Sequence, residues 1–210
     1  MKKVAVLTGD IVNSSNLVPK RRKELEQLLW KVLEKMKSNN DKYDVLRGDS
    51  VQFLTENVQQ AFRKAIQMRC MIKYGMAGNF KTKIDARISI GIGDITFAGK
   101  TVGSSDGTAF RYSGQGLDQL KQLKKRIMIL TGNDKLDDIF NIIAVLTDVI
   151  VTGWTSAQAE AVFWSSVGLT QQQIADKLSI VQSAVNNRLQ SAHWNEIEEA
   201  LIFFERHILD

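Results

Sequence analysis

Two spacings of apolar residues alternate along the first half of the chain, and their order predicts a fold. The apolar run at residues 3–8 predicts a buried strand. After Pro19, leucines and other apolar residues recur every three or four positions up to Met36, which predicts an amphipathic helix. Two short apolar runs, YDVLR and VQFL, flank Gly48-Asp49-Ser50 and predict a hairpin.

The next two elements complete a known order of strands and helices. Residues 58–73 place apolar side chains at helical spacing, which predicts a second helix. Residues 84–92 alternate apolar with polar or small residues, which predicts a strand with one buried face. The order βαββαβ is that of the ferredoxin-like arrangement, in which the first strand lies antiparallel beside the third. We therefore predict an α+β fold that begins with a ferredoxin-like domain.

The second half of the chain is predicted to be mainly helical. A helix is expected over 110–123, a short strand over 126–130 and a further helix over 135–151. This last segment is so apolar that we expect it to be largely buried. We divide the chain into a domain at residues 1–150 and an all-α domain at residues 151–210.

Composition narrows the class of protein. The chain has 210 residues, 44% of them hydrophobic, which is enough to bury a sizeable core. No apolar run approaches the ~20 residues of a membrane helix. The apolar stretch in the first ten residues, MKKVAVLTGD, is too short for a signal peptide. A cytoplasmic protein without membrane partners is the expectation. The single Cys70 and the distant His193 and His207 offer no zinc constellation, and Cys70 is expected in the core.

Charge is distributed unevenly between the two predicted domains. Residues 1–150 contain 25 Lys and Arg against 16 Asp and Glu, a net charge of +9. Residues 151–210 contain 3 against 7, a net charge of −4. A basic domain suits an anionic partner such as a nucleotide or nucleic acid, although each cluster of lysines and arginines taken alone is more simply a solvated helix face.

Each of two apolar strands is followed or interrupted by a Gly-Asp pair, which contains Asp10 in the first case and Asp49 in the second. Because the first strand is expected to lie antiparallel beside the third, its end should share a sheet edge with the hairpin, so the two aspartates could meet. Carboxylates, with the Ile11 carbonyl beside them, are the ligands that Mg²⁺ or Mn²⁺ prefers, and these ions commonly accompany a nucleotide triphosphate. The alternative is that both aspartates are turn residues that accept backbone hydrogen bonds, and spacing alone favours that alternative.

The tail contains a helix-turn-helix pattern. A helix is expected to end at Gly168, Thr170 to cap the next helix, and a tight turn at residues 179–181 to precede a helix over 182–192. Burial of Val185 and Leu189 would leave polar side chains outward that can contact the edges of bases in a major groove. The expected DNA contacts are Thr170, Gln182, Ser183, Asn186, Asn187, Arg188 and Gln190. The alternative is three packed helices with a polar solvent face, which the single basic residue of the second helix, Arg188, favours.

The segments TGDIVNSS and LRGDSVQFL resemble the metal-aspartate motifs of class III nucleotide cyclases, and ARISIGIGDI is similar to the strand after the second helix of those enzymes. The resemblance implies a metal pair at Asp10 and Asp49. It also implies nucleotide contacts at Ile11, Arg47, Gly48, Asp106 and Arg111. The cyclase groups that hold the base, the ribose and the phosphates correspond here to Thr108, Arg111 and Gln115. We therefore expect a nucleotide with Mg²⁺ or Mn²⁺ to bind without being cyclised.

A second resemblance covers nearly the whole chain. The motifs GDIVNS, GDSVQFL, ISIGIGDI and SSDGTAF, followed by the helix-turn-helix, resemble the SatD family in content and order. That resemblance implies DNA binding.

Three functions of different classes follow from these observations. The first is a DNA-binding transcriptional regulator whose front domain senses a nucleotide or a metal, and which is a monomer or a homodimer. The second is a metal-dependent nucleotide enzyme, and the third is a protein-interaction adaptor. We rank them in that order, because the helix-turn-helix pattern is the most specific signal and the cyclase groups are missing.

Overall fold

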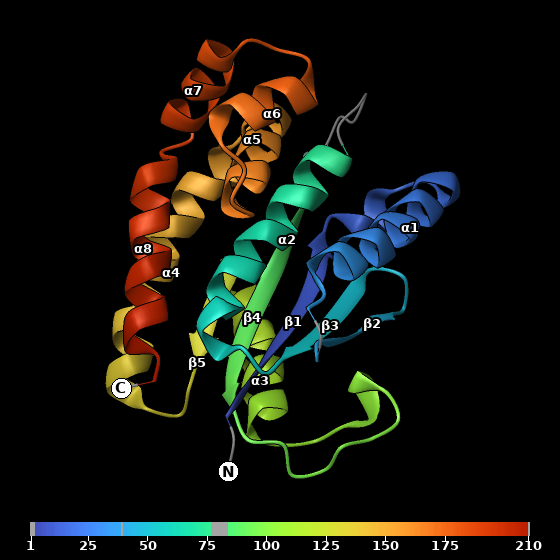
Figure 1. The fold of residues 1–210 in the computed structure, drawn as a ribbon. Helices are drawn as coiled ribbons and strands as arrows, with labels where there is room; N and C mark the ends of the chain where they lie inside the picture. The colour runs from blue at the N-terminus through green and yellow to red at the C-terminus, as the bar shows by residue number, and fades with distance from the viewer. Residues whose placement is uncertain (1–2, 39, 77–83, 210) are drawn as a thin grey trace.

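The computed structural model describes residues 3–38, 40–76 and 84–209 and shows a five-stranded sheet with helices on both faces (Figure 1). The mixed α+β architecture agrees with the prediction. The elements in chain order are β1 (Val4–Val12), η1 (Ser14–Asn16), α1 (Pro19–Met36), β2 (Lys42–Leu46), β3 (Ser50–Thr55), η2 (Val58–Gln60), α2 (Ala61–Gly75), β4 (Asp85–Gly93), η3 (Val102–Ser104), α3 (Thr108–Leu123), β5 (Ile127–Leu130), α4 (Asp134–Gly153), α5 (Ser156–Ser166), α6 (Gln171–Leu178), α7 (Gln182–Ser191) and α8 (Trp194–His207).

The strands lie in the order β2-β3-β1-β4-β5. The first four strands form antiparallel pairs, so β1 lies antiparallel beside β3 as the ferredoxin-like order predicts. β5 adds a fifth strand parallel to β4, which it reaches through the crossover helix α3. The expected end of the first strand at residue 8 is corrected to Val12, because pairing with β4 continues through Val12.

Alternation along β1 separates two apolar layers. Ala5 and Leu7 belong to the large core cluster that also contains α1 and α2. Val4 and Val6 point to the other face, where they pack with Phe110 of α3. Successive side chains of a strand point to opposite faces, so the parity of a β1 residue decides which helix layer it contacts.

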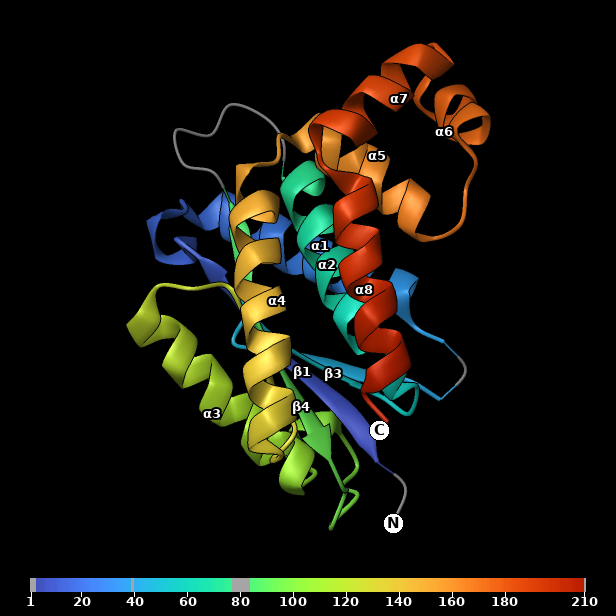
Figure 2. The same ribbon diagram turned by 90° about the vertical axis from the view of Figure 1, so that its left-hand side faces the viewer.

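The C-terminal helices pack against α2 and share the large core with the sheet domain. Phe204 of α8 lies 5.6 Å from Phe62 of α2 and 4.9 Å from Phe140 of α4, measured between ring centroids. Figure 2 shows α4 and α8 running side by side in front of α2. The predicted division after residue 150 falls inside α4, which continues to Gly153, and not in a linker. The apolar end of the chain covers this shared core through Leu201, Phe204 and Ile208.

The expectation that the helix over 135–151 is largely buried is wrong. α4 buries one side, which includes Phe140, Ala144 and Val151, against the sheet and the tail. Its other side is exposed along the helix. Hydropathy alone could not separate the two sides, because both are apolar. No helix within the described ranges has the length and apolar character that crossing a membrane requires.

A buried ionic network joins α2, β4 and α4. The guanidinium of Arg69, which is fully buried, donates to both carboxylate oxygens of Asp85 at 3.0 and 2.8 Å and to Asp148 at 2.9 Å. Burial raises the pKa of Asp85, but the adjacent Arg69 outweighs it and holds that pKa below its usual value. Burial likewise lowers the pKa of Lys73, the second cation beside Asp85. Burial also raises the pKa of the Cys70 thiol, which lies in the core as expected.

Candidate functional site

The hairpin between β2 and β3 presents an aspartate on a tight loop. Leu46 pairs with Ser50, so the loop consists of Arg47, Gly48 and Asp49. Arg47 has a φ of 54° and Gly48 a φ of 78°, and positive φ at two successive residues suits the twist of a two-stranded ribbon. Glycine adopts this conformation without strain, whereas Arg47 is held in it by the loop. The Gly-Asp pair is therefore a turn element, and its carboxylate is available beside α1.

A cleft of ≈ 630 Å³ lies between this hairpin, η1 and the first turns of α1. Three cationic side chains and two carboxylates share its lining. The lining residues are Ser14, Ser15, Pro19, Arg22, Lys23, Leu25, Glu26, Arg47, Gly48 and Asp49. Of the metal and nucleotide residues predicted from the sequence, the structure brings Arg47, Gly48 and Asp49 together here.

Hydrogen bonds fix part of the cleft lining in place. Ser14 donates its hydroxyl to Asp49 at 2.6 Å, which joins the loop after β1 to the hairpin. Arg22 donates to the carbonyls of Leu17 and Ser15 at 3.0 and 2.8 Å, which orders the same loop. The other two cationic residues of the lining, Lys23 and Arg47, have exposed side chains. A negatively charged ligand, with or without a divalent cation, is the chemistry that this lining suits.

Sequence reasoning missed Ser14, Arg22, Lys23 and Glu26. A signal was present, because the basic run PKRRK follows a strand and a short loop, which is where the N-terminus of a helix adds its own positive field. The run instead suggested only a solvated helix face.

The backbone of Asp10 lies beside that of Asp49 on adjacent segments of the sheet, but the two carboxylates have different partners. The amide of Ile11 donates to the carbonyl of Asp49 at 3.0 Å. Asp10 is on the parity of β1 that faces α3, and it accepts from Arg87 at 2.7 and 3.2 Å. Lys121 of α3 lies 3.8 Å from the same carboxylate. The topology thus places both residues at one sheet edge, as expected. Alternation along β1 directs the Asp10 side chain toward α3, whereas Asp49 lies in the hairpin loop and contacts Ser14.

The other residues predicted to bind a nucleotide lie outside the cleft lining. Ile11 is buried in the core below α1 and α2. Asp106 and Arg111 form an exposed ion pair at 3.2 Å around the start of α3. Thr108 accepts from the backbone amide of Asp94 at 2.7 Å, so its hydroxyl is part of the loop before α3. Gln115 is exposed on α3. Among the described residues, no group of three or more Asp, Glu, His or Cys side chains is arranged to hold a metal ion.

In the tail, α6 and α7 are joined by a turn of three residues. Thr170 accepts from the amide of Gln173 and donates its own amide to the Gln173 side chain, a reciprocal cap at the start of α6. Ser179 ends α6 in the left-handed conformation, with a φ of 55°. α7 then begins at Gln182, as the sequence predicts, and ends at Ser191, one residue before the predicted end.

One side of α7 is polar and open to solvent. Val185 and Leu189 are buried against the neighbouring helices, whereas Gln182, Ser183, Asn187 and Gln190 are exposed. Two of the predicted contacts are less open than expected. Asn186 is half-buried and accepts from Gln171 of α6 at 3.4 Å, and Arg188 is half-buried as well. The exposed face is therefore narrower than the sequence predicts.

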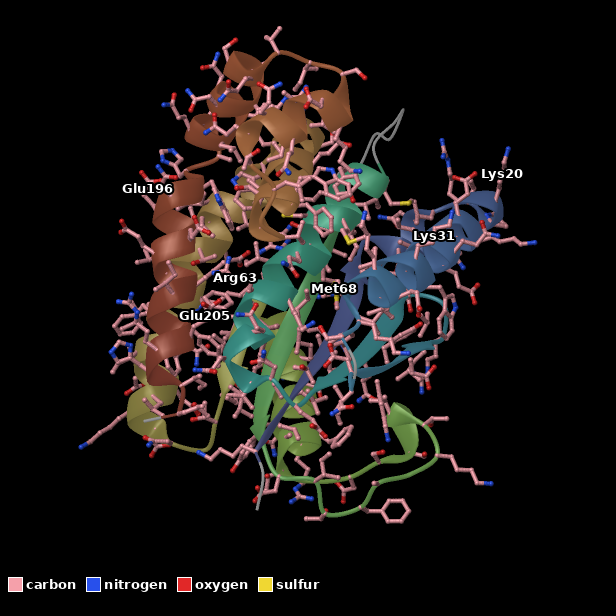
Figure 3. All side chains as sticks on the ribbon, in the orientation of Figure 1. Lys20, Lys31, Arg63, Met68, Glu196 and Glu205 are labelled. Atoms are coloured by element: carbon pink, nitrogen blue, oxygen red, sulfur yellow. The ribbon has the colours of Figure 1, made fainter. Side chains whose placement is uncertain are left out.

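Two of the acidic residues of the tail face the sheet domain. Glu205 of α8 accepts from Arg63 of α2 at 2.7 Å, and Figure 3 shows these two side chains pointing toward one another. Glu198 lies 3.7 Å from the same guanidinium. The negative charge of these two residues is therefore partly neutralised away from the exposed face of α7.

Comparison with known proteins gives one family match and several similar structures. The model described as the SatD family matches residues 4–195. No curated protein matches the chain. The chain is similar to the active GGEEF domain of a diguanylate cyclase from Vibrio cholerae, with 17% identity over 63% of this chain and 84% of that chain and a TM-score of 0.45. It is also similar to a bacterial light-regulated adenylyl cyclase, with 13% identity over 60% of this chain and 42% of that chain and a TM-score of 0.45.

Proposed function

The chain belongs to the SatD family, and from the geometry of its tail we propose that it is a DNA-binding regulator that contacts bases through α7. The observation that carries the proposal is the exposed polar face of α7, which follows a capped helix and a three-residue turn. In helix-turn-helix proteins the second helix lies in the major groove and its polar side chains contact base edges. Ser183, Asn187 and Gln190 lie at i, i+4 and i+7, so they share one side of the helix.

Affinity for DNA requires more positive charge than the tail supplies. Residues 151–210 carry a net charge of −4, and neutralisation of phosphates supplies most of the non-specific affinity for DNA. We assign the missing phosphate contacts to the basic front domain, to residues such as Lys121 and Lys124, or to a second copy of the chain. Arg188 is the phosphate contact that α7 itself offers. A protein-interaction adaptor would need none of these cations. The salt dependence of DNA binding therefore separates a DNA-binding regulator from an adaptor.

Alanine substitution on α7 tests the base contacts. Asparagine and glutamine make paired hydrogen bonds to adenine, so we expect Asn187→Ala or Gln190→Ala to cost ~1–3 kcal/mol at one base position of the bound site. The measurement is the affinity of the full-length variant for the selected DNA site and for each single-base change of it. Asn195→Ala is the matched control, because Asn195 is an exposed asparagine on α8. Equal affinities for all three variants would contradict base contact by α7.

A second function is favoured by the cleft between the hairpin and α1. We propose that it binds a phosphorylated nucleotide as the regulatory ligand, with the phosphates beside Lys23 and Arg47. The donor set also fits a divalent cation: Asp49 and Glu26 line the same cleft, and Mg²⁺ commonly takes one or two carboxylates together with phosphate oxygens. Asp10 would join them only after leaving Arg87. Cyclisation is not expected, because the positions that correspond to the cyclase groups are occupied by Thr108, Arg111 and Gln115.

Alanine substitution of the cationic residues in the cleft tests nucleotide binding. We expect Arg47→Ala or Lys23→Ala to weaken the binding of GTP or ATP with Mn²⁺ by about tenfold each, since each removes one charge-assisted contact to phosphate. Lys31→Ala is the control, because Lys31 is exposed on the same helix but outside this cleft (Figure 3). Calorimetry measures the binding, and chromatography of the incubated nucleotide should show no cyclic product. Formation of a cyclic nucleotide that Asp49→Asn abolishes would instead make the protein an enzyme.

A further inference from the structure

One side of α4 carries an apolar stripe that the described chain leaves largely uncovered. Ile139, Ile142, Leu146 and Val149 are 46%, 64%, 63% and 71% exposed. They are four of the twelve large hydrophobic side chains that are exposed among the described residues, so exposed apolar surface is concentrated on this helix. Figure 2 shows α4 on the outside of the molecule, facing the viewer.

The spacing of the stripe is that of a helix-pairing seam. The four positions are separated by three, four and three residues, the a and d pattern of a heptad. The side chains are all Ile, Leu or Val, which suit the knobs of such a seam. A helix that carries this pattern is complementary to another helix with the same pattern, and a second copy of this chain supplies one.

Charge selects the direction of pairing. The first turns of α4 carry two exposed carboxylates, Asp134 and Asp138, against one exposed cation, Lys135, so this end is acidic on balance. The basic segment Lys124–Arg126 lies beside the other end of the helix, because Arg126 donates its amide to Asp148 at 2.9 Å and its guanidinium to Thr152 at 3.4 Å. An antiparallel pair brings the acidic end of each copy to the basic end of its partner and opposes the two helix dipoles. A parallel pair would bring the acidic ends together.

We propose that α4 is the interface of a two-fold symmetric homodimer, in which the stripes of two copies pack antiparallel. A two-fold axis makes the same patch face itself, so a residue i that contacts residue j is matched by j contacting i. With the centre of the stripe on the axis, Ile142 of each copy lies against Leu146 of its partner. Such a dimer requires neither DNA nor a nucleotide.

Sedimentation of the full-length protein over a range of concentrations tests the dimer. We expect a reversible dimer whose dissociation constant rises at least ~10-fold in Leu146→Glu, because a carboxylate would be buried in the seam. Phe97→Glu is the control, because Phe97 is 61% exposed on a loop away from α4. A wild-type protein that stays monomeric at high concentration overturns the proposal, and so does a dimer that Leu146→Glu leaves unchanged.

Cysteine cross-linking tests the antiparallel arrangement. The native Cys70 is fully buried and does not compete. With oxidised glutathione as the oxidant, each new disulfide forms as two thiols lose their hydrogens and two reduced glutathiones are produced. An equimolar mixture of Ile142→Cys and Leu146→Cys should form mixed cross-linked dimers faster than either variant alone. Equal or faster cross-linking within each variant alone would contradict the antiparallel register.

Discussion

Replacement of Arg69 by leucine is expected to destabilise the protein by about 3–5 kcal/mol, the cost of breaking a buried ion pair from one side. Arg69 is fully buried and neutralises both Asp85 and Asp148. Leucine would fill part of the volume but would leave two carboxylates without their strongest partner. Urea unfolding, followed by circular dichroism, measures the change.

A surface pair provides the control for Arg69→Leu. Arg21 and Glu24 form an exposed ion pair one turn apart on α1, so Glu24→Gln should change the free energy of unfolding by less than about 1 kcal/mol. The pH dependence of the free energy of unfolding gives a second measure of the buried network. The native pKa of Asp85 is lowered from 3.8, so its contribution to stability is complete above that value and is lost as the pH falls through the lowered native pKa. If Arg69→Leu lowered the free energy of unfolding no more than Glu24→Gln does, the buried network would contribute little to stability.

The tail is expected to be unfolded when it is separated from the sheet domain. Phe163 of α5 and Phe204 of α8 are buried against side chains of α2, at ring distances of 5.9 Å from Tyr74 and 5.6 Å from Phe62. A fragment of residues 151–210 would expose these faces, and a chain this short buries too small a share of its surface to offset that loss. The measurement is a thermal melt by circular dichroism, with the full chain as reference. A cooperative transition in the fragment would instead support an independent C-terminal domain.

The sequence predicts most elements of this fold, because each one has a clear period. The alternation of residues 84–92 and the turn at Gly48 complete the order βαββαβ, which predicts that β1 lies antiparallel beside β3, as it does. The continuation of β1 beyond residue 8 was harder to predict. Gly9 and Asp10 interrupt the apolar run, yet both pair with β4 because strand hydrogen bonds use backbone groups, whatever the side chain.

The candidate sites were predicted less completely, since they depend on the direction of side chains. The topology brings Asp10 and Asp49 to one edge, but their side chains have different partners. The position of Asp10 along β1 directs it to Arg87, and the hairpin loop directs Asp49 to Ser14. Helical periodicity predicts that the Asn186 side chain points outward. It is half-buried because Gln171 of α6 donates to it, a tertiary contact that helical periodicity does not contain. Likewise, the apolar composition of α4 predicts a largely buried helix, although the described chain covers one side of it.

The most direct measurement of the central proposal is the affinity of the full-length protein for genomic DNA fragments at several salt concentrations, compared with Asn187→Glu. Binding through phosphates and bases should weaken steadily as salt rises, and a carboxylate on the exposed face of α7 should abolish selection of a preferred sequence. Arg188→Ala should lower affinity for all sequences and reduce the salt slope by about 1. Absence of DNA binding even at low salt, or sequence selection that Asn187→Glu leaves intact, would contradict a regulator that contacts DNA through α7.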